Sequence, residues 1–243
     1  MTLVSADFAF RQDRYRAWRY FIRDVLLRSL AFHLLAKVEV RGFDHIPLSG
    51  GTIVLFNHID AIDPVVILGV VRPRFAVPMS KVENFSLPIF GTLMKRWGAY
   101  PVHRDRTDKQ AVQNTISLTE QGHLVLIAPE GTRSPALIRG KDGAAFAAVR
   151  TGATIVPAAI DGTPALLSNL KRLRRTPITI TFGRAFRFNA QGDVPRQALT
   201  VMTDEAMYRL AALLPPERRG VYSDLDKATT KTLEFLPYTP FAS

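Results

Sequence analysis

The stretch that decides the fold is Thr52-Ile53-Val54-Leu55-Phe56, followed at once by Asn57-His58-Ile59-Asp60-Ala61-Ile62-Asp63-Pro64. The first five residues are rich in β-branched and apolar side chains, which predicts a buried strand. His58 follows the end of this strand, and Pro64 closes the loop. In open α/β sheets such loops face the crevice where ligands bind. If Asp63 opens the next helix, its carboxylate can fold back onto one imidazole nitrogen and leave the other free as a base.

The spacing of His58 and its aspartate is weak evidence by itself, because it arises readily by chance in a chain of this length. His103 and Asp108 have the same spacing. The context favours His58, because a strand leads into it and Asn57 precedes it. His103 lies beside a run of charges, Arg104-Asp105-Arg106, which indicates an exposed turn. We therefore take His58 as the candidate base.

Apolar segments and helical segments alternate along the rest of the chain. The expected strands cover residues 37–40, 52–56, 74–78, 99–102, 123–128, 154–160 and 178–182. The expected helices cover residues 65–71, 81–97, 107–121, 142–151 and 195–214, with a basic loop at 170–176 and a tail of little pattern after Ala228. This alternation predicts an α/β fold with a mostly parallel sheet flanked by helices. No linker divides residues 37–243, so we expect a single domain there.

Residues 1–36 form a separate N-terminal segment in this interpretation. Residues 8–36 contain no Pro or Gly and are rich in Leu, Arg and aromatic side chains, which predicts one or two amphipathic helices. One alternative is a helix packed on the domain core. The other is a membrane-docking segment whose aromatic side chains lie at the headgroup level, with Arg16, Arg19 and Arg23 on lipid phosphates.

The composition excludes several classes of protein. Lys plus Arg number 32 and Asp plus Glu 21, so the net charge is +11, which favours anionic partners: nucleic acid, acidic lipid or a phosphorylated substrate. The absence of Cys excludes disulfides, Cys-ligated metals and a Cys nucleophile. No stretch of eighteen apolar residues predicts a transmembrane helix, and no nucleic-acid-reading motif is present, so nucleic acid is not an expected partner.

Three polar loops follow expected strands and are expected to converge at one edge of the sheet. They carry His58 and Asp63, then Arg104 and Arg106, then Glu130 to Ser134. A base beside several arginines suits a substrate with both a hydroxyl and a phosphate, because the Arg fork binds phosphate oxygens in pairs. No Ser elbow, Gly-rich nucleotide loop or metal-ligand cluster is present, and we expect no metal.

Four ordered blocks carry a family resemblance. They are Asn57-His58-x-x-x-x-Asp63, Gly98-Ala99-Tyr100-Pro101-Val102-His103-Arg104, Ala128-Pro129-Glu130-Gly131-Thr132-Arg133-Ser134 and Ile155-Val156-Pro157-Ala158. Together they resemble the glycerophospholipid acyltransferases, and most closely the 1-acylglycerol-3-phosphate acyltransferases, the PlsC-like proteins. Asp60 and His103 depart from the pattern, since the family often has Ser at the first position and Asp or Asn at the second.

The resemblance implies transfer of a fatty acyl group from acyl-CoA or acyl-carrier protein to the hydroxyl of 1-acylglycerol-3-phosphate, without a cofactor. It implies His58 as the base and Asp63 as its orienting partner. It also implies a peripheral or monotopic location on the cytoplasmic face of an anionic membrane. The residues that it assigns to substrate binding are Asn57, Arg104, Glu130, Gly131, Thr132, Arg133 and Pro157, of which Pro157 would shape the pocket.

Other interpretations stay open at this point. The acceptor could be glycerol-3-phosphate or another lysolipid, or the chain could be a non-catalytic basic module that binds a membrane or nucleic acid. Glu130 and Arg133 could form a salt bridge that orders their loop. Arg104 and Arg106 could form a solvated face, and His58 could be a buried histidine with structural bonds only.

Overall fold

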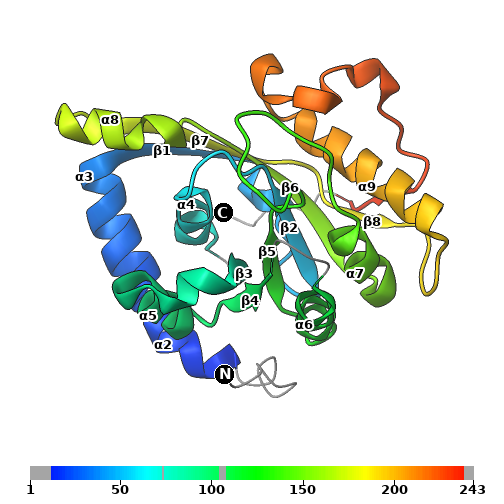
Figure 1. Ribbon diagram of the computed structural model, residues 1–243, viewed down its shortest axis with the longest axis horizontal. Helices are drawn as coiled ribbons and strands as arrows, with labels where there is room; N and C mark the ends of the chain where they lie inside the picture. Colours follow the sequence, from blue (N-terminus) through cyan, green and yellow to red (C-terminus); the bar gives the residue numbers. More distant parts are fainter. Residues whose placement is uncertain (1–11, 73, 104–107, 238–243) are drawn as a thin grey trace.

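The computed structural model describes residues 12–72, 74–103 and 108–237. In these ranges nine strands form one sheet in the order β1-β7-β6-β2-β5-β3-β4, with β8 paired to β6 and β9 to β8 (Figure 1). The strands are β1(Ala36–Arg41), β2(Thr52–Phe56), β3(Ala76–Lys81), β4(Tyr100–Val102), β5(Leu124–Ile127), β6(Thr154–Asp161), β7(Thr176–Phe182), β8(Phe186–Phe188) and β9(Leu233–Phe235). The predicted α/β fold with a mostly parallel sheet flanked by helices is confirmed.

Helices cover both faces of this sheet. The α-helices are α2(Arg16–Tyr20), α3(His33–Leu35), α4(Asp63–Val70), α5(Pro88–Trp97), α6(Lys109–Glu120), α7(Gly143–Thr151), α8(Leu166–Lys171) and α9(Arg196–Ala211). A π-helical stretch, η2(Phe21–Phe32), joins α2 to α3. Single turns are η1(Gln12–Tyr15), η3(Phe43–His45), η4(Val82–Ser86), η5(Thr163–Ala165), η6(Pro216–Arg218), η7(Gly220–Tyr222) and η8(Leu225–Lys227).

Strand β2 lies at the centre of the sheet and is buried along its whole length. It pairs with β5 on one side and β6 on the other, and all three strands run parallel. The carboxyl ends of parallel neighbours lie at the same edge of a sheet. The loops after β2, β5 and β6 therefore meet, although they lie far apart in the sequence.

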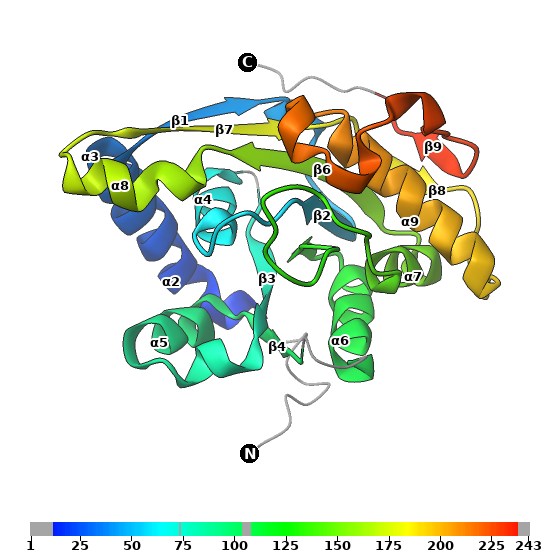
Figure 2. The same cartoon turned by 45° about the horizontal axis from the view of Figure 1, so that its top comes forward.

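The two faces of the sheet bury two separate hydrophobic clusters. Because side chains alternate along a strand, Ile53 and Leu55 of β2 face the cluster under α6, α7 and α9. Val54 and Phe56 face the cluster under α4 and the N-terminal helices. Figure 2 shows these two helical layers on opposite sides of the sheet. Burial on both faces explains why the β2 sequence is a continuous apolar run rather than an alternating one.

The N-terminal helices pack on the domain through one side. Ile22 joins the cluster around α4, and the ring of Phe32 lies so close to Gly69 that any side chain at that position would collide with it. The opposite side exposes apolar residues: Trp18, Phe21, Val25, Leu30 and Leu34. The first alternative, packing on the core, therefore describes one side of the segment, and membrane docking of the exposed apolar residues stays a prediction.

Arg19 and Arg23 do not point outward, so their expected contact with lipid phosphates is wrong. Both are buried. Arg19 Nε donates to the carbonyl oxygen of Trp97 at 2.7 Å, and Arg23 Nη1 donates to that of Val71 at 3.3 Å. These carbonyls lie at the C-terminal ends of α5 and α4, where unpaired acceptors and the helix dipole attract a cation. The two arginines cap helices from a neighbouring element.

Several boundaries differ from the sequence-based expectation. The predicted helix 81–97 is wrong in its first half, because β3 continues to Lys81 and a single turn precedes Pro88, which starts α5. The basic loop 170–176 begins inside α8. The tail after Ala228 contains β9, which pairs with β8. Strands of three residues, such as β8 and β9, give too short a pattern to detect.

None of the described helices has the length and apolar character needed to cross a bilayer.

Candidate active site

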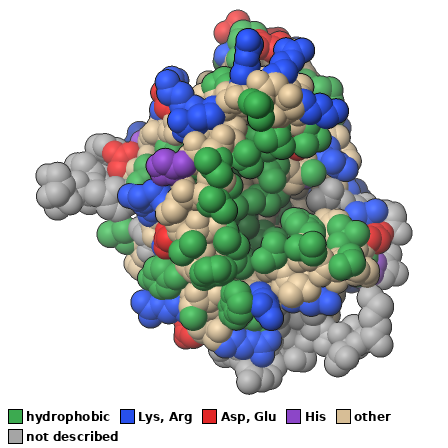
Figure 3. Space-filling model, turned by 90° about the vertical axis from the view of Figure 1, so that its left-hand side faces the viewer, with side chains coloured by type: hydrophobic (Ala, Val, Ile, Leu, Met, Phe, Trp, Pro, Cys, Tyr) green, Lys and Arg blue, Asp and Glu red, His purple; other side chains and the backbone are tan. Residues whose placement is uncertain are grey.

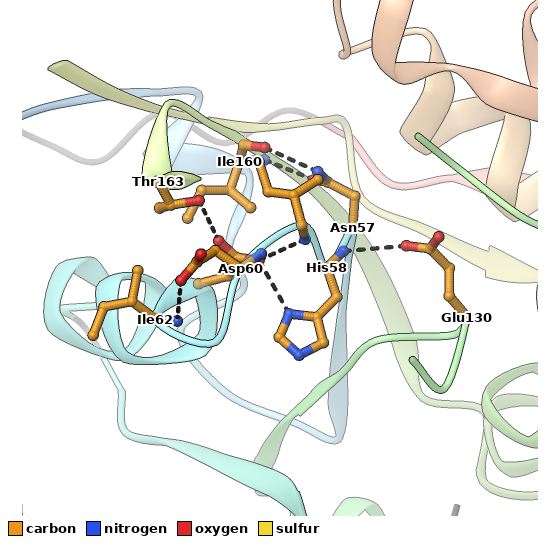
Figure 4. Close-up of polar contacts among 9 residues, drawn as sticks. Asn57, His58, Asp60, Ile62, Glu130, Ile160 and Thr163 are labelled. Atoms are coloured by element: carbon orange, nitrogen blue, oxygen red, sulfur yellow. Dashed lines mark hydrogen bonds and ion pairs between the residues drawn. The ribbon is translucent and has the colours of Figure 1, made fainter. Parts of the chain in front are cut away.

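His58 and Asp63 form the predicted pair. Asp63 is the first residue of α4, and its Oδ2 lies 3.0 Å from Nδ1 of His58 (Figure 4). Because a carboxylate oxygen accepts, Nδ1 carries the proton and Nε2 is the basic nitrogen. His58 lines a large cavity, and Nε2 has no protein partner in the part of the chain that the structure describes. The pair can therefore remove a proton from a bound hydroxyl group.

The carboxylate of Asp63 is fully buried and is bound by four donors. Besides His58, its Oδ2 accepts the backbone N–H groups of Ile59 and Asp60, both at 2.7 Å. Its Oδ1 accepts the hydroxyl of Thr163 at 2.5 Å. Both carboxylate oxygens are thus bound, and the first turn of α4 places the positive end of the helix dipole beside them. Asp63 is held in one orientation against the imidazole.

Thr163 is a functional residue that the sequence did not reveal. It follows β6, and Figure 4 shows it on the loop beside the one that carries His58. The two residues lie 100 positions apart. No local pattern announces such a contact, which depends on β6 lying beside β2 in the sheet.

Asp60, the departure near His58, does not compete for the imidazole. Its Oδ1 accepts the backbone N–H of Ile62 at 3.1 Å, within the loop that leads into α4. An aspartate and a serine both form this local turn through a side-chain oxygen, so the exchange of one for the other preserves the loop. Asp60 also lines the cavity.

Glu130 ties the loop after β5 to the loop after β2. Its Oε1 accepts the backbone N–H of His58 at 3.1 Å, and its Oε2 accepts that of Ile138 at 3.1 Å. Both carboxylate oxygens are therefore occupied by backbone donors, and neither forms the considered salt bridge with Arg133. Burial raises the pKa of Glu130 to about 7, with a smaller contribution from the charge of Asp63, against the opposing effect of the two N–H donors.

Asn57 and Pro157 also hold the strands rather than face the cavity. The side chain of Asn57 donates to the carbonyl oxygen of Ile160 at 2.9 Å and accepts its N–H at 2.8 Å. This pair of bonds joins the ends of β2 and β6. Pro157 lies inside β6 opposite Leu55, and neither Asn57 nor Pro157 is among the residues that line the cavity.

The cavity has a volume of about 1820 Å³. This exceeds the roughly 300–1,000 Å³ of most small-molecule sites and suits a ligand with long chains. Gly131 and Arg133 of the third block line it, whereas Thr132 is exposed and does not. Arg104 lies outside the described residues. The apolar part of the wall is formed by side chains from α4, α5, α6 and α8, among them Val65, Leu68, Leu87, Phe90, Met94, Ile116 and Leu167.

Two further groups at the cavity were missed or underrated by the sequence. Lys141 lines it and places its Nζ beside Gly131, close to the position that a Cβ there would take. His103 and Asp108, expected in an exposed turn, also line it and are bonded, with Nδ1 and Oδ2 2.8 Å apart. The cavity thus joins an oriented base, cationic side chains and a long apolar wall. Among the described residues, no group of three or more His, Cys, Asp or Glu could hold a metal ion.

Comparison with known proteins agrees with this geometry. The chain is 29% identical over 231 residues to a 1-acyl-sn-glycerol-3-phosphate acyltransferase of Chlamydomonas reinhardtii, covering 92% of this chain and 67% of that protein. It is 32% identical over 130 residues to a 1-acyl-sn-glycerol-3-phosphate acyltransferase of Bacillus subtilis, covering 53% and 65%. The chain thus spans about two thirds of the length of each of these relatives.

The fold has a solved counterpart. The crystal structure of the 1-acyl-sn-glycerophosphate acyltransferase PlsC from Thermotoga maritima superposes with a TM-score of 0.61 at 22% identity, over 92% of this chain and 87% of that chain. Residues 37–161, just over half of the chain, match the family model named Acyltransferase. The match contains the loops after β2 and β5, with His58, Asp63 and Glu130. The chain belongs to the acyltransferase family.

Proposed function

We propose that this protein transfers a fatty acyl group from an acyl thioester to the free hydroxyl of 1-acylglycerol-3-phosphate, giving phosphatidic acid for phospholipid synthesis. The observation that carries the proposal is the buried His58–Asp63 pair, whose free Nε2 lies at a cavity that combines cations with a long apolar wall. The printed names of the algal and Bacillus relatives support the same acceptor. A non-catalytic binding module has no need of a base held in this way.

The chemistry follows from the geometry of the pair. Nε2 of His58 takes the hydroxyl proton while the hydroxyl oxygen attacks the thioester carbonyl, and Asp63 stabilises the imidazolium that forms. The C–S bond of the tetrahedral intermediate then breaks, and the thiolate leaves with the proton from Nε2. General-base help of this kind is worth on the order of 10²–10⁴ in rate. Neither a metal nor a cofactor enters the scheme; acyl-CoA or acyl-carrier protein supplies the acyl group as a co-substrate.

The acceptor phosphate is assigned to the cationic part of the cavity. Arg133 lines the cavity, and its guanidinium makes no ion pair with a described carboxylate. Gly131 keeps the loop open, and its φ of 70° favours glycine at that position. Arg104 and Thr132 stay in the proposal on the resemblance alone. Asn57, Glu130 and Pro157 act indirectly in this proposal, by fixing the strand ends that carry the reacting groups.

The protein is proposed to work at the surface of an anionic membrane, as a peripheral or monotopic enzyme of the cytoplasmic face. Figure 3 shows hydrophobic side chains gathered around a hollow, with Lys and Arg side chains beyond them. The exposed apolar residues of the N-terminal helices, among them Phe21, Leu30 and Leu34, are available for contact with lipid. A membrane-bound acceptor would then reach the cavity without crossing water.

The test offers the purified protein acyl-CoA or acyl-carrier protein together with a panel of acceptors: lysophosphatidate, glycerol-3-phosphate, and lysolipids without a free phosphate. Products are read by mass spectrometry. Phosphatidic acid should form fastest, and a His58→Ala variant should make it on the order of 10²–10⁴ times more slowly. Preferred acylation of glycerol-3-phosphate or of a neutral lysolipid would correct the acceptor. A folded His58→Ala variant with wild-type turnover would end the proposal.

A further inference from the structure

Helix α8 ends in a conformation that its sequence does not suit. The N–H of Arg174 bonds to the carbonyl oxygen of Asn169 at 2.9 Å, and the N–H of Leu173 to that of Leu170 at 3.0 Å. These are the two bonds of a Schellman motif, which puts Leu173 at the left-handed C′ position, where glycine is usual. Leu173 has a φ of 52° and is the single non-glycine residue with positive φ in the described part of the chain.

Leu173 is also the most exposed large apolar side chain of the described residues, at 94% of its surface. A leucine in the left-handed region is strained, and a fully exposed leucine leaves its apolar surface in water. A glycine or asparagine would remove the strain and the exposed surface together. The position therefore makes physical sense only if something apolar receives this side chain.

The leucine belongs to a larger apolar surface that two distant segments share. Leu167, six residues earlier in α8, is 70% exposed and lines the cavity. Arg175 Nη2 donates to the carbonyl oxygens of Phe32 at 3.2 Å and Ala36 at 2.8 Å, which fastens this turn to the end of the N-terminal helices. Figure 1 shows α8 beside α3.

The charge around the turn has one sign. Residues 162–192 contain six basic residues and no acidic residue. Lys171, Arg172 and Arg174 flank the leucine, are exposed, and form no ion pair with a described carboxylate. Exposed leucines surrounded by basic residues match the two parts of an anionic lipid leaflet, its acyl chains and its phosphates. An acidic protein surface would satisfy the charges but not a leucine surface that continues to the mouth of the cavity.

We propose that residues 166–175, the α8 turn, dock into an anionic bilayer leaflet: Leu173 enters the acyl-chain region, and Lys171, Arg172 and Arg174 contact lipid phosphates. The turn is a second membrane contact besides the N-terminal helices, at the same edge of the sheet as His58. The proposed function supplies the reason for this contact with the membrane. The contact itself is tested separately, because lipid binding is measured without turnover.

The first test is co-sedimentation of the full chain with vesicles of phosphatidylcholine containing phosphatidylglycerol. Leu173→Asn should bind these vesicles on the order of tenfold more weakly, because one buried leucine is lost from the lipid. The same variant should unfold at a midpoint about 2 °C higher in the absence of lipid, because asparagine tolerates the left-handed conformation. A residue whose loss weakens binding and stabilises the free protein is one that faces lipid under strain.

The matched control is Leu48→Asn. Leu48 is 63% exposed but lies in the loop before β2, at the opposite edge of the sheet. Its replacement should leave vesicle binding unchanged. The triple variant Lys171→Ala, Arg172→Ala, Arg174→Ala should weaken binding to phosphatidylglycerol vesicles about fivefold for each charge and reduce its salt dependence. It should leave binding to pure phosphatidylcholine unchanged.

Unchanged vesicle binding by both Leu173→Asn and the triple variant would overturn the proposal. If both instead bind vesicles as the wild type does but raise the KM for an acyl-carrier-protein donor, the turn is a protein-docking surface and the lipid assignment is wrong. Turnover of monomeric lysophosphatidate separates this result from the proposed function. A wild-type protein that binds vesicles through Leu173 but acylates no acceptor would refute the enzymatic proposal alone.

Discussion

Two His–Asp pairs, whose histidines line the same cavity, differ in what surrounds them. In both, the aspartate follows the histidine by five residues and bonds to its Nδ1: at 3.0 Å for His58 and Asp63, and at 2.8 Å for His103 and Asp108. In both, the histidine follows a strand and the aspartate stands at the start of a helix. The shared spacing is therefore a property of a strand–loop–helix connection.

The difference lies in the neighbours of each strand. His58 follows β2, between β5 and β6, so its N–H is bound by Glu130 from one side and its aspartate by Thr163 from the other. His103 follows β4, at the edge of the sheet, and its N–H is bound by its own Asp108. The side chain of His103 is 36% exposed, against 7% for His58. The neighbours of a central strand thus fix and bury the histidine, which the same connection leaves more exposed at the edge of the sheet.

The largest contrast should appear when each histidine is removed. His58→Ala should lower kcat by about 10²–10⁴, because the base is lost while the fold is kept. His103→Ala should lower it by less than about tenfold. Steady-state kinetics with matched acyl-CoA and lysophosphatidate give both values, and circular dichroism checks that each variant is folded. Equal losses would mean that the two pairs share the chemistry.

Glu130 should give the surroundings of the central pair a pH dependence of their own. Its pKa is raised from 4.5 to about 7 in the folded protein. Between these pH values the folded state holds a proton that the unfolded state has lost, so this group makes stability fall as pH rises, by about 3 kcal/mol in total.

Glu130→Gln removes this titration. Urea unfolding of both proteins across that pH range should show the wild type losing stability relative to the variant as the pH increases. Parallel stability curves would show that Glu130 titrates alike in both states.

Removing the charge of each aspartate should again separate the pairs. Asp63→Asn keeps the shape but loses the anion that stabilises the imidazolium, so kcat should fall by up to about 10⁴-fold. Asp108→Asn keeps an equally good helix N-cap for the N–H of Ala111, so stability should change by less than about 0.5 kcal/mol. Turnover and thermal unfolding measured side by side report both, and a strong loss of turnover only in Asp108→Asn would reverse the assignment.

The smallest loss of turnover at the central pair should follow from replacing Thr163, a residue that has no counterpart at the edge pair. Thr163→Val keeps the shape but leaves Oδ1 of the buried Asp63 without its donor, which should cost about 2 kcal/mol of stability. Turnover should fall less than in Asp63→Asn. Thr200→Val, which removes a weaker bond of 3.2 Å to Asp142 at the cavity, is the matched control. Equal losses of stability would show that Thr163 is only a packing residue.

The sequence predicts the central part of the fold and the reacting pair because both are local. The apolar run before His58 is a buried strand by composition, and the return of Asp63 to the imidazole needs only a short loop and a helix start. The parallel arrangement follows from the alternation of strands and helices. These features depend on the local sequence and not on the order of the strands in the sheet.

The parts that were missed depend on the order of the strands. Thr163 and Glu130 reach the pair only because β6 and β5 flank β2, and sequence periodicity does not give strand order. The resemblance assigns Glu130 to the substrate, and its two carboxylate oxygens each accept a backbone N–H group, which no sequence pattern indicates. The sequence predicts that Arg19 and Arg23 contact lipid phosphates, because they fall in one row of an amphipathic helix. Their partners are instead carbonyl groups at the ends of distant helices.

The burial of Arg19 and Arg23 has a consequence for how the molecule unfolds. Each guanidinium satisfies carbonyl oxygens at the end of a helix of the domain, so detachment of the N-terminal helices uncovers acceptors that belong to α4 and α5. Fraying of one part then destabilises the other, and the two should melt in a single cooperative transition. The sequence pattern changes at residue 36, but the helices before it should unfold together with the domain that holds the base in place.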